Sequence, residues 1–175
     1  EEEARIRVTP RAPLQEDDLK EQAKQVLEDL LHLLEAQATV SVAPPLAEIE
    51  STPPPLVLDV RDGNLAWLIG RWGQNLDALQ YILNLILTHQ LKASVRVVVD
   101  VSGYKRNRYR ALRQMALQLA QEVAASGKPV TLEPMSALER RIIHLSLAEH
   151  PVVTTQSEGE GENRKVVIQK KLQDA

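Results

Sequence analysis

A pair of glycines three positions apart interrupts an apolar segment between two helical patterns. The segment reads LIGRWGQNLDALQ from Leu68, and Gly70 and Gly73 bracket Arg71 and Trp72. Because glycine has no side chain, such a loop permits a tight turn and lets another backbone approach the protein closely. Any fold for this chain must therefore place the loop between two helices.

The hydrophobic pattern on either side of this loop predicts helices and strands in a defined order. Apolar residues three and four apart indicate an amphipathic helix, alternation indicates a strand, and β-branched residues favour strands. The predicted order is helix, strand, strand, helix, helix, strand. The six elements are expected at Asp17–Ala36, Thr39–Ala43, Leu56–Arg61, Asn64–Ile69, Gln74–His89 and Ser94–Val101.

Gly103 ends this pattern, and a second group of elements follows it. A long helix, a short strand, another helix and two strands are expected, the last two joined by the polar loop SEGEGENR. We therefore expect an α+β protein with an acidic, proline-containing tail or linker, a first domain and a smaller second domain. These parts are expected at residues 1–15, 16–102 and 103–175, and the elements of the second domain at Tyr104–Ala125, Lys128–Pro134, Ser136–Glu149, Pro151–Gln156 and Lys165–Gln169.

The net charge of the chain is -3, but this charge is unevenly distributed. Residues 1–55 hold 5 basic and 12 acidic residues, whereas residues 60–148 hold 12 basic and 6 acidic ones. An acidic N-terminal segment followed by a basic central segment is typical of a polyanion-binding protein, although ordinary surface charge gives the same asymmetry. Both interpretations stay open on charge alone.

The composition excludes several kinds of site. The chain has no cysteine, which excludes disulfides, thiolate metal sites and a cysteine nucleophile and fits a reducing compartment. No apolar run approaches the roughly 20 residues that a membrane span needs. The chain opens with EEEAR and no initiator methionine, so we expect it to begin part-way through a longer protein.

The glycine loop has the chemistry of a clamp for single-stranded nucleic acid. The helix that follows it directs free amides and the positive end of its dipole toward the loop, which favours a phosphate group. Arg71 adds a cation that binds phosphate or stacks on a base. A GXXG clamp of this kind holds about four nucleotides, whereas turn glycines between packed helices give the same tetrapeptide. The predicted binding residues of the clamp are Gly70, Arg71, Trp72, Gly73 and Gln74.

Two other interpretations of the loop fail, and the role of Trp72 has two alternatives. The loop lacks the Gly-Lys-Ser/Thr of a P-loop, and it lacks the third glycine and the preceding strand of a dinucleotide-binding fingerprint. The indole of Trp72 either stacks on a base or packs on the hydrophobic core beside Trp67.

The helix after the loop has almost no polar face. A helix that is apolar nearly all round must be covered on more than one side. The sheet covers one side, and the other is covered either by the C-terminal domain or by a second surface of the same kind in a dimer. The apolar side chains are Leu76, Ala78, Leu79, Tyr81, Ile82, Leu83, Leu85, Ile86 and Leu87.

A second basic surface is predicted on the helix that follows Gly103. At 100° per residue, three arginines and a tyrosine fall within an arc of about 100°, away from the apolar stripe. Residues 103–121 contain no acidic residue, whereas a solvated charged face normally mixes both signs. Arginines with an interleaved tyrosine suit phosphate contacts and base stacking. With their neighbour Lys105 included, the predicted binding residues are Lys105, Arg106, Tyr109, Arg110 and Arg113.

A later helix carries Arg140 and His144 four residues apart on one face. The other histidines, His32, His89 and His150, offer no ligand set for a metal, and no motif places a serine, a base and an orienting acid together. Paired arginine and histidine donors instead suit a contact with a phosphate backbone. We therefore predict no catalytic residue, no metal and no cofactor.

Longer stretches of the sequence resemble the bacterial Jag family, also called KhpB or EloR, in which a type II KH domain precedes an R-three-H domain. The similar stretches are LIGRWGQNLDALQYI, DVSGYKRNRYRALRQMALQLA, GKPVTLEPMSALERRIIH and TTQSEGEGENRKVVI, and the resemblance spans about residues 17–170. It implies a KH domain with a three-stranded sheet and helices on one face, followed by a small α/β R-three-H domain. It also implies the clamp at Gly70–Gly73 and the binding pair at Arg140 and His144.

The same resemblance implies a cytoplasmic protein that binds single-stranded RNA, or single-stranded DNA, and acts after transcription. In several family members this control concerns cell elongation or division. The partner that it implies is a small single-KH-domain protein, with a second copy of this chain as the alternative. Family members commonly have a further N-terminal Jag-N domain, whereas this chain shows an acidic start and a short linker. A small or charged residue is expected where Trp72 stands.

Two other functions stay open beside RNA binding without catalysis. In the first, the chain is an interaction scaffold whose KH domain mainly mediates dimerisation. In the second, it is an accessory factor of the ribosome that uses the KH domain on structured RNA.

Overall fold

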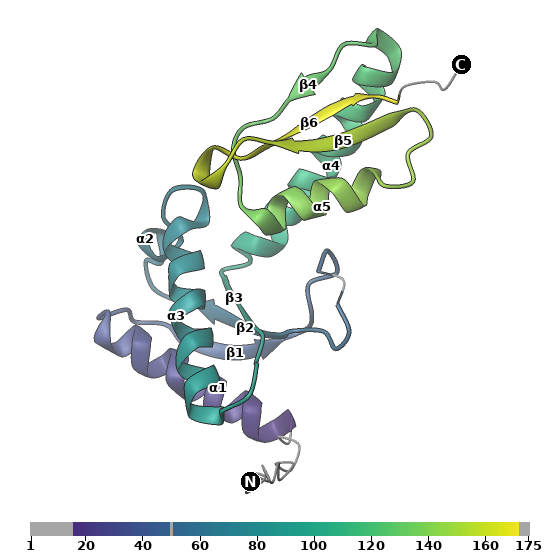
Figure 1. The fold of residues 1–175 in the computed structure, drawn as a ribbon. Coiled ribbons are helices and arrows are strands. Elements are labelled where there is room, and N and C mark those ends of the chain that lie inside the picture. The colour runs from purple at the N-terminus through teal and green to yellow at the C-terminus, as the bar shows by residue number, and fades with distance from the viewer. Residues whose placement is uncertain (1–15, 50, 172–175) are drawn as a thin grey trace, which may run out of the picture.

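The computed structural model describes residues 16–49 and 51–171, so the tail expected at residues 1–15 lies outside the described residues. The chain forms two groups of helices and strands, each built on a three-stranded sheet (Figure 1). This arrangement is the predicted α+β class. The first group consists of α1 (Glu16–Leu33), β1 (Thr39–Ala43), β2 (Leu56–Arg61), α2 (Ala66–Ile69), the 3-10 turn η1 (Arg71–Gly73), α3 (Gln74–Leu91) and β3 (Val97–Val101). The second consists of α4 (Tyr104–Ser126), β4 (Val130–Thr131), α5 (Ala137–Leu147), β5 (Val153–Glu158), the 3-10 turn η2 (Gly161–Asn163) and β6 (Lys165–Lys170).

The first sheet has the strand order β1-β2-β3 and carries α1 and α3 on one face (Figure 1). β1 and β2 are antiparallel, whereas β2 and β3 are parallel, with Leu58 opposite Val99. Because side chains alternate between the two faces of a strand, Leu58, Val60 and Val99 enter one core together. The two helices close that core with the buried residues Ala23, Leu27, Leu31, Leu76, Leu79, Leu83 and Leu87. The predicted element order, with helices on one face of the sheet, is confirmed.

The second sheet has the order β4-β6-β5 and is antiparallel throughout. α4 and α5 pack against it, and their buried side chains share one core with Val166 and Ile168 of β6. That core also takes in Val57 and Val98, which point away from α1 and α3 on the far face of the first sheet. Tyr109 of α4 belongs to the same core, so α4 packs against both sheets.

The bounds of several elements differ from the predicted ones at their ends. β3 begins at Val97 rather than at Ser94, since pairing with β2 begins where Val97 lies opposite Leu56. α5 begins at Ala137, after Ser136, which caps the helix with its side chain. Within the described ranges, no helix combines the length and the apolar character needed to cross a membrane.

One side of α3 is apolar and uncovered. Tyr81, Ile82 and Leu85 are 69%, 45% and 56% exposed, and they recur at helical spacing on the side turned away from the sheet. In the part of the chain that the structure describes, the second group does not cover these side chains. The prediction that the C-terminal domain covers this side of the helix, one of two alternatives, is therefore wrong.

β3 forms an edge of the first sheet, and α3 supplies side chains to the backbone groups that β2 does not pair. Asn84 Nδ2 donates to the carbonyl oxygen of Val97, and Asn84 Oδ1 accepts from its N–H, both at 2.8 Å. Gln80 Oε1 accepts from the N–H of Val99 at 3.1 Å. An unpaired strand edge is open to pairing with other chains, so these contacts protect the edge and hold α3 beside β3.

Replacing Asn84 by leucine is expected to lower the free energy of unfolding by about 2 kcal/mol, because both backbone groups of Val97 lose a partner. Urea unfolding followed by circular dichroism measures this change. Thr88→Ala, on the exposed side of the same helix, is the matched control and should leave the midpoint nearly unchanged. An Asn84→Leu midpoint equal to that of the parent would show that β3 does not depend on this side chain.

Candidate nucleic-acid interface

The loop between α2 and α3, which we call the clamp loop (Gly70–Gln74), requires both of its glycines. Gly70 and Gly73 adopt left-handed backbone angles, with φ of 69° and 84°. A Cβ on Gly70 would lie 2.6 Å from the side chain of Asn75, and one on Gly73 would lie 3.1 Å from the ring of Tyr104. Asn75 has little freedom to move away, because its Nδ2 donates to the carbonyl oxygen of Trp67 at 2.7 Å.

The clamp loop exposes the groups expected to meet a ligand. Arg71 and Gln74 are exposed. The N–H of Gln74 donates to the carbonyl oxygen of Arg71, and no capping side chain occupies the next amides of α3, whose N-cap is Gly73. These amides carry the positive end of the helix dipole, which favours an anion. The local geometry is therefore that of an anion-binding loop beside an exposed cation.

Trp72 is not part of the hydrophobic core. Its side chain is 64% exposed and that of Trp67 is 46% exposed, so the core-packing alternative for Trp72 is wrong. Its backbone is left-handed, with φ of 55° and ψ of 22°, which is uncommon for a residue other than glycine. The guanidinium carbon of Arg108 lies 5.4 Å from the centroid of the Trp72 ring, a cation–π distance.

Arg108 is held in place by Glu139 at the start of α5. Its Nε donates to Glu139 Oε1 at 2.8 Å, and Glu139 Oε2 accepts from the N–H of Ser136 at 3.0 Å. Ser136 Oγ in turn accepts from the N–H of Glu139 at 3.3 Å, which completes a capping box. The sequence prediction missed Arg108, although the Ser-x-x-Glu spacing of the capping box is visible in the sequence.

The basic surface predicted on α4 divides into exposed and buried residues. Arg110 and Arg113 are exposed as predicted, and Arg106 is half-buried, with its Nη2 3.4 Å from the carbonyl oxygen of Pro44. Tyr109 is buried, contrary to the prediction, because the far face of the first sheet packs against the side of α4 that the helical wheel leaves to solvent. This burial also raises the pKa of Tyr109.

Lys105 is also buried rather than part of an exposed surface. Its Nζ lies 2.9 Å from Asp77 Oδ1 and donates to Gln80 Oε1 at 2.7 Å, and both partners belong to α3. The side chain is 4% exposed. A buried lysine needs partners of this kind, so its charge is used inside the protein and is not available to a ligand.

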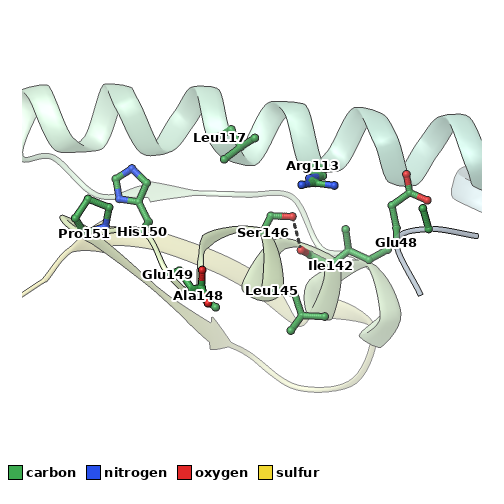
Figure 2. A pocket seen from close by; sticks show the side chains of 11 residues that line it. Glu48, Arg113, Leu117, Ile142, Leu145, Ser146, Ala148, Glu149, His150 and Pro151 are labelled. Atoms are coloured by element: carbon green, nitrogen blue, oxygen red, sulfur yellow. Dashed lines mark hydrogen bonds between the residues drawn. The ribbon is translucent and has the colours of Figure 1, made fainter. Parts of the chain in front are cut away.

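Arg113 lies apart from Arg140 and His144. It lines a groove of about 630 Å³ between α4 and α5, in which Figure 2 shows it near Ser146 and Ile142. Helical spacing places these two α5 residues on the side opposite Arg140 and His144. The groove also carries the acidic side chains of Glu48 and Glu149 (Figure 2), so it is not a uniformly basic surface.

Arg140 and His144 face strand β5, where they meet two hydroxyl groups. His144 Nδ1 lies 2.6 Å from Thr155 Oγ1, and His144 Nε2 lies 2.8 Å from Ser157 Oγ. Arg140 Nη1 donates to Ser157 Oγ at 3.3 Å, whereas its buried Nε has no partner among the described residues. Both ring nitrogens of His144 are therefore engaged within the protein.

The charge state of His144 follows from its surroundings. Burial lowers the pKa of His144 below its ordinary value of 6.5, and the positive charges of Arg140 and Arg164 lower it further. A lowered pKa keeps the imidazole neutral at pH 7. We call these side chains the arginine–histidine cluster, which consists of Arg140, His144, Thr155, Ser157 and Arg164.

Three members of this cluster were not predicted from the sequence. Thr155 and Ser157 are two apart on β5, so alternation places them on one face, but the predicted strand ended at Gln156 and left Ser157 in the polar loop. The approach of that face to α5 is a tertiary contact that spacing alone does not predict. Arg164, directly before β6, carries no local signal beyond its charge.

Two family models match separate parts of the chain. The KH domain of KhpA and KhpB matches residues 24–99, and the R-three-H domain matches residues 110–170. The clamp loop lies inside the first match, and the arginine–histidine cluster lies inside the second.

Curated relatives match long stretches of the chain. The RNA-binding protein KhpB of Clostridium symbiosum is 31% identical over 158 residues, which cover 90% of this chain and 69% of that protein. The RNA-binding protein KhpB of Bacillus subtilis is 42% identical over 109 residues, covering 61% of this chain and 52% of that protein. That of Lactiplantibacillus plantarum is 42% identical over 101 residues, or 58% of this chain and 31% of that protein. With its KH and R-three-H regions in this order, the chain belongs to the KhpB family.

Proposed function

We propose that this chain binds single-stranded RNA through the clamp loop and the arginine–histidine cluster, without catalysing a reaction. The observation that carries the proposal is the clamp loop itself: two left-handed glycines, an exposed Arg71 and the open N-terminus of an 18-residue helix. The relatives' name as RNA-binding proteins supports RNA as the polyanion. The KH domain would span residues 16–102 and the R-three-H domain residues 103–175. The proposed role is cytoplasmic control of gene expression after transcription, linked to cell elongation or division.

In the clamp loop, the RNA backbone would pass over Gly70 and Gly73. The first amides of α3 would donate to one phosphate, and Arg71 would contact the next. Substituting either glycine disturbs the clamp loop in two ways, because a Cβ clashes with Asn75 or crowds Tyr104 and the left-handed backbone becomes strained. Gln74 is exposed at the first turn of α3 and would contact the sugar or a base edge.

In the arginine–histidine cluster, His144 would act as a positioning residue rather than as a cation that touches phosphate. A hydroxyl hydrogen of Thr155 donated to Nδ1 leaves Nε2–H to donate to Ser157 Oγ. Ser157 Oγ then accepts from both His144 and Arg140, so its own hydrogen is free to donate to a phosphate. Arg140 and Arg164 supply the positive charge.

The exposed stripe on α3 (Tyr81, Ile82 and Leu85) supports a partner of the same fold. Monomeric proteins rarely expose a contiguous apolar surface without a function for it. We propose that a small single-KH-domain protein, or a second copy of this chain, covers the stripe. The stripe and the clamp loop occupy different parts of α3, so assembly and RNA binding would proceed together.

The double variant Gly70→Asp/Gly73→Asp should bind a labelled single-stranded RNA at least tenfold more weakly than the parent, because added carboxylates repel the phosphates and the clashes with Asn75 and Tyr104 distort the clamp loop. Arg140→Ala/His144→Ala should weaken binding by a similar factor through the second surface. Fluorescence anisotropy measures both. Gly127→Asp is the matched control, since Gly127 is also left-handed but has open space around it at the end of α4. Unchanged RNA affinity in both double variants, together with altered assembly, would favour the scaffold function.

The pH dependence of RNA binding tests the neutral state of His144. Because the pKa of His144 is lowered in the folded protein, its imidazole stays mostly neutral between pH 8 and 6.5, and affinity should change little over that range. Ser157→Ala should lower affinity about tenfold at every pH in the range, since a hydrogen bond to a charged group is lost. An affinity increase that begins above pH 6.5 and disappears in His144→Gln would instead show a direct imidazolium–phosphate contact.

Replacing Ile82 and Leu85 by glutamate should prevent assembly through α3 and leave RNA affinity within about twofold of the parent. This chain's apolar side of the proposed interface is lost, and in a homodimer both sides are lost, whereas the clamp loop is unaltered. Sedimentation velocity, alone and with a single-KH-domain protein, measures assembly. A matched control is Thr88→Glu/His89→Glu, at exposed polar positions of the same helix. Assembly that survives the first variant would place the interface elsewhere.

A further inference from the structure

Trp72 combines two features that are unfavourable for a residue with a purely structural role. Its backbone occupies the left-handed region between two glycines, where a bulky side chain is strained. Its indole is 64% exposed, so most of the ring surface contributes nothing to the folding of the chain. A small residue would fit the same loop at a lower cost in free energy, which suggests that the ring itself has a use.

The ring is supported from one side. The guanidinium carbon of Arg108 lies 5.4 Å from the ring centroid, and Arg108 is itself fixed by its 2.8 Å contact with Glu139. Glu139 is buried and belongs to the capping box of α5. Arg108 holds the ring, and the buried carboxylate of Glu139 holds Arg108. The Trp72 side chain has therefore lost much of its rotational freedom before a ligand binds. This preorganisation reduces the entropy lost on binding.

The remaining surface of the ring is open to solvent and lies in the clamp loop. Arg71 precedes it, and the first amides of α3 follow it. A flat aromatic surface beside two anion-binding groups matches the parts of a nucleotide, whose base is flat and whose phosphate is charged. Every nucleobase has a face that stacks on an aromatic side chain, so such a surface binds without strong base preference.

A contact that served only to join the clamp loop to α4 would look different. It would bury the indole between the two elements, and Trp72 would lose most of its exposed area. Instead, Arg108 supports the ring while leaving 64% of the side chain accessible. The cation therefore orients the ring rather than covering it.

We infer that Trp72, supported by Arg108, is a stacking platform for one base of the RNA strand held by the clamp loop. This inference rests on the proposed function and adds a base contact to its phosphate contacts. The platform also lies on the route to the second surface, because Glu139, which fixes Arg108, directly precedes Arg140 of the arginine–histidine cluster. A strand that leaves the platform along α5 reaches that cluster within the same chain.

The test uses the Trp67→Phe variant, in which Trp72 is the sole tryptophan and the carbonyl that Asn75 contacts is kept. The probes are a 12-nucleotide oligouridylate and an abasic oligomer of equal length and charge. Oligouridylate should quench the emission of Trp72, and the abasic oligomer should not. Adding Trp72→Leu should weaken oligouridylate binding about tenfold and leave binding of the abasic oligomer unchanged, whereas Trp72→Phe should retain most of the affinity. Arg108→Gln should weaken oligouridylate binding by a smaller factor.

The possible failures can be told apart. In the first, the Trp67→Phe variant binds oligouridylate without a change in its emission, and adding Trp72→Leu leaves the affinity unchanged. The inference that Trp72 stacks on a base is then wrong, whereas RNA binding by the clamp loop stands. If Trp72→Leu weakens both oligomers equally and lowers the unfolding midpoint, Trp72 only joins the loop to α4, and the platform is again wrong. If oligouridylate binds neither the Trp67→Phe variant nor the parent, the proposed function fails and the platform fails with it.

Discussion

The packing of α4 against both sheets is the contact on which the arrangement of the two surfaces depends. Tyr109 shares a core with Val57 and Val98 on the far face of the first sheet, and the same helix closes the core of the second sheet. Apolar burial is favourable but not directional. Direction comes from Lys105, because its buried ammonium group contacts Asp77, which is half exposed, and donates to Gln80, both on α3. The junction is therefore a packed core with a polar contact that specifies its register, and the clamp loop lies directly beside it.

Much of the fold could be predicted from the sequence, because the patterns that encode it are local. The bounds of β1 and β2 were predicted to the residue, β1 from its alternation and β2 from a run between prolines and the Asp62-Gly63 turn. Tyr109 and Lys105 were wrongly predicted to be exposed, because a helical wheel assumes one buried face. α4 has two buried faces in its first turns, and the second one exists only because a sheet from another part of the chain packs there. No local pattern carries that information.

In the candidate site, the sequence likewise predicted which residues take part but not the contacts that each of them makes. The spacing of Arg140 and His144 correctly predicted that they share one face of a helix, and the direct contact between His144 and Ser157 was not predictable. The motif suggested a cation facing phosphate, whereas the contacts of the ring nitrogens and the lowered pKa favour a neutral imidazole that orients hydroxyl groups. Trp72 is a similar case. Its neighbour Arg108 comes from a distant part of the sequence, so the ring's support could not be deduced from the loop.

The packed junction also bears on how two modest binding surfaces would act as one. When a flexible linker joins two sites, the effective concentration of the second depends on linker length. Here Glu139 binds Arg108, and Arg108 contacts the ring of Trp72 in the clamp loop. Arg140 of the arginine–histidine cluster directly follows Glu139 in the sequence, so the start of α5 contributes to both surfaces. The separation of the surfaces is then set by side-chain contacts instead of by chain entropy. A strand engaged at the clamp loop would meet the cluster at a fixed distance, and affinity would depend on strand length more sharply than with a flexible linker. The overall charge of -3 does not by itself oppose such binding, because phosphate contacts act within about a Debye length, roughly 8 Å at physiological salt, and the two surfaces include Arg71, Arg140 and Arg164.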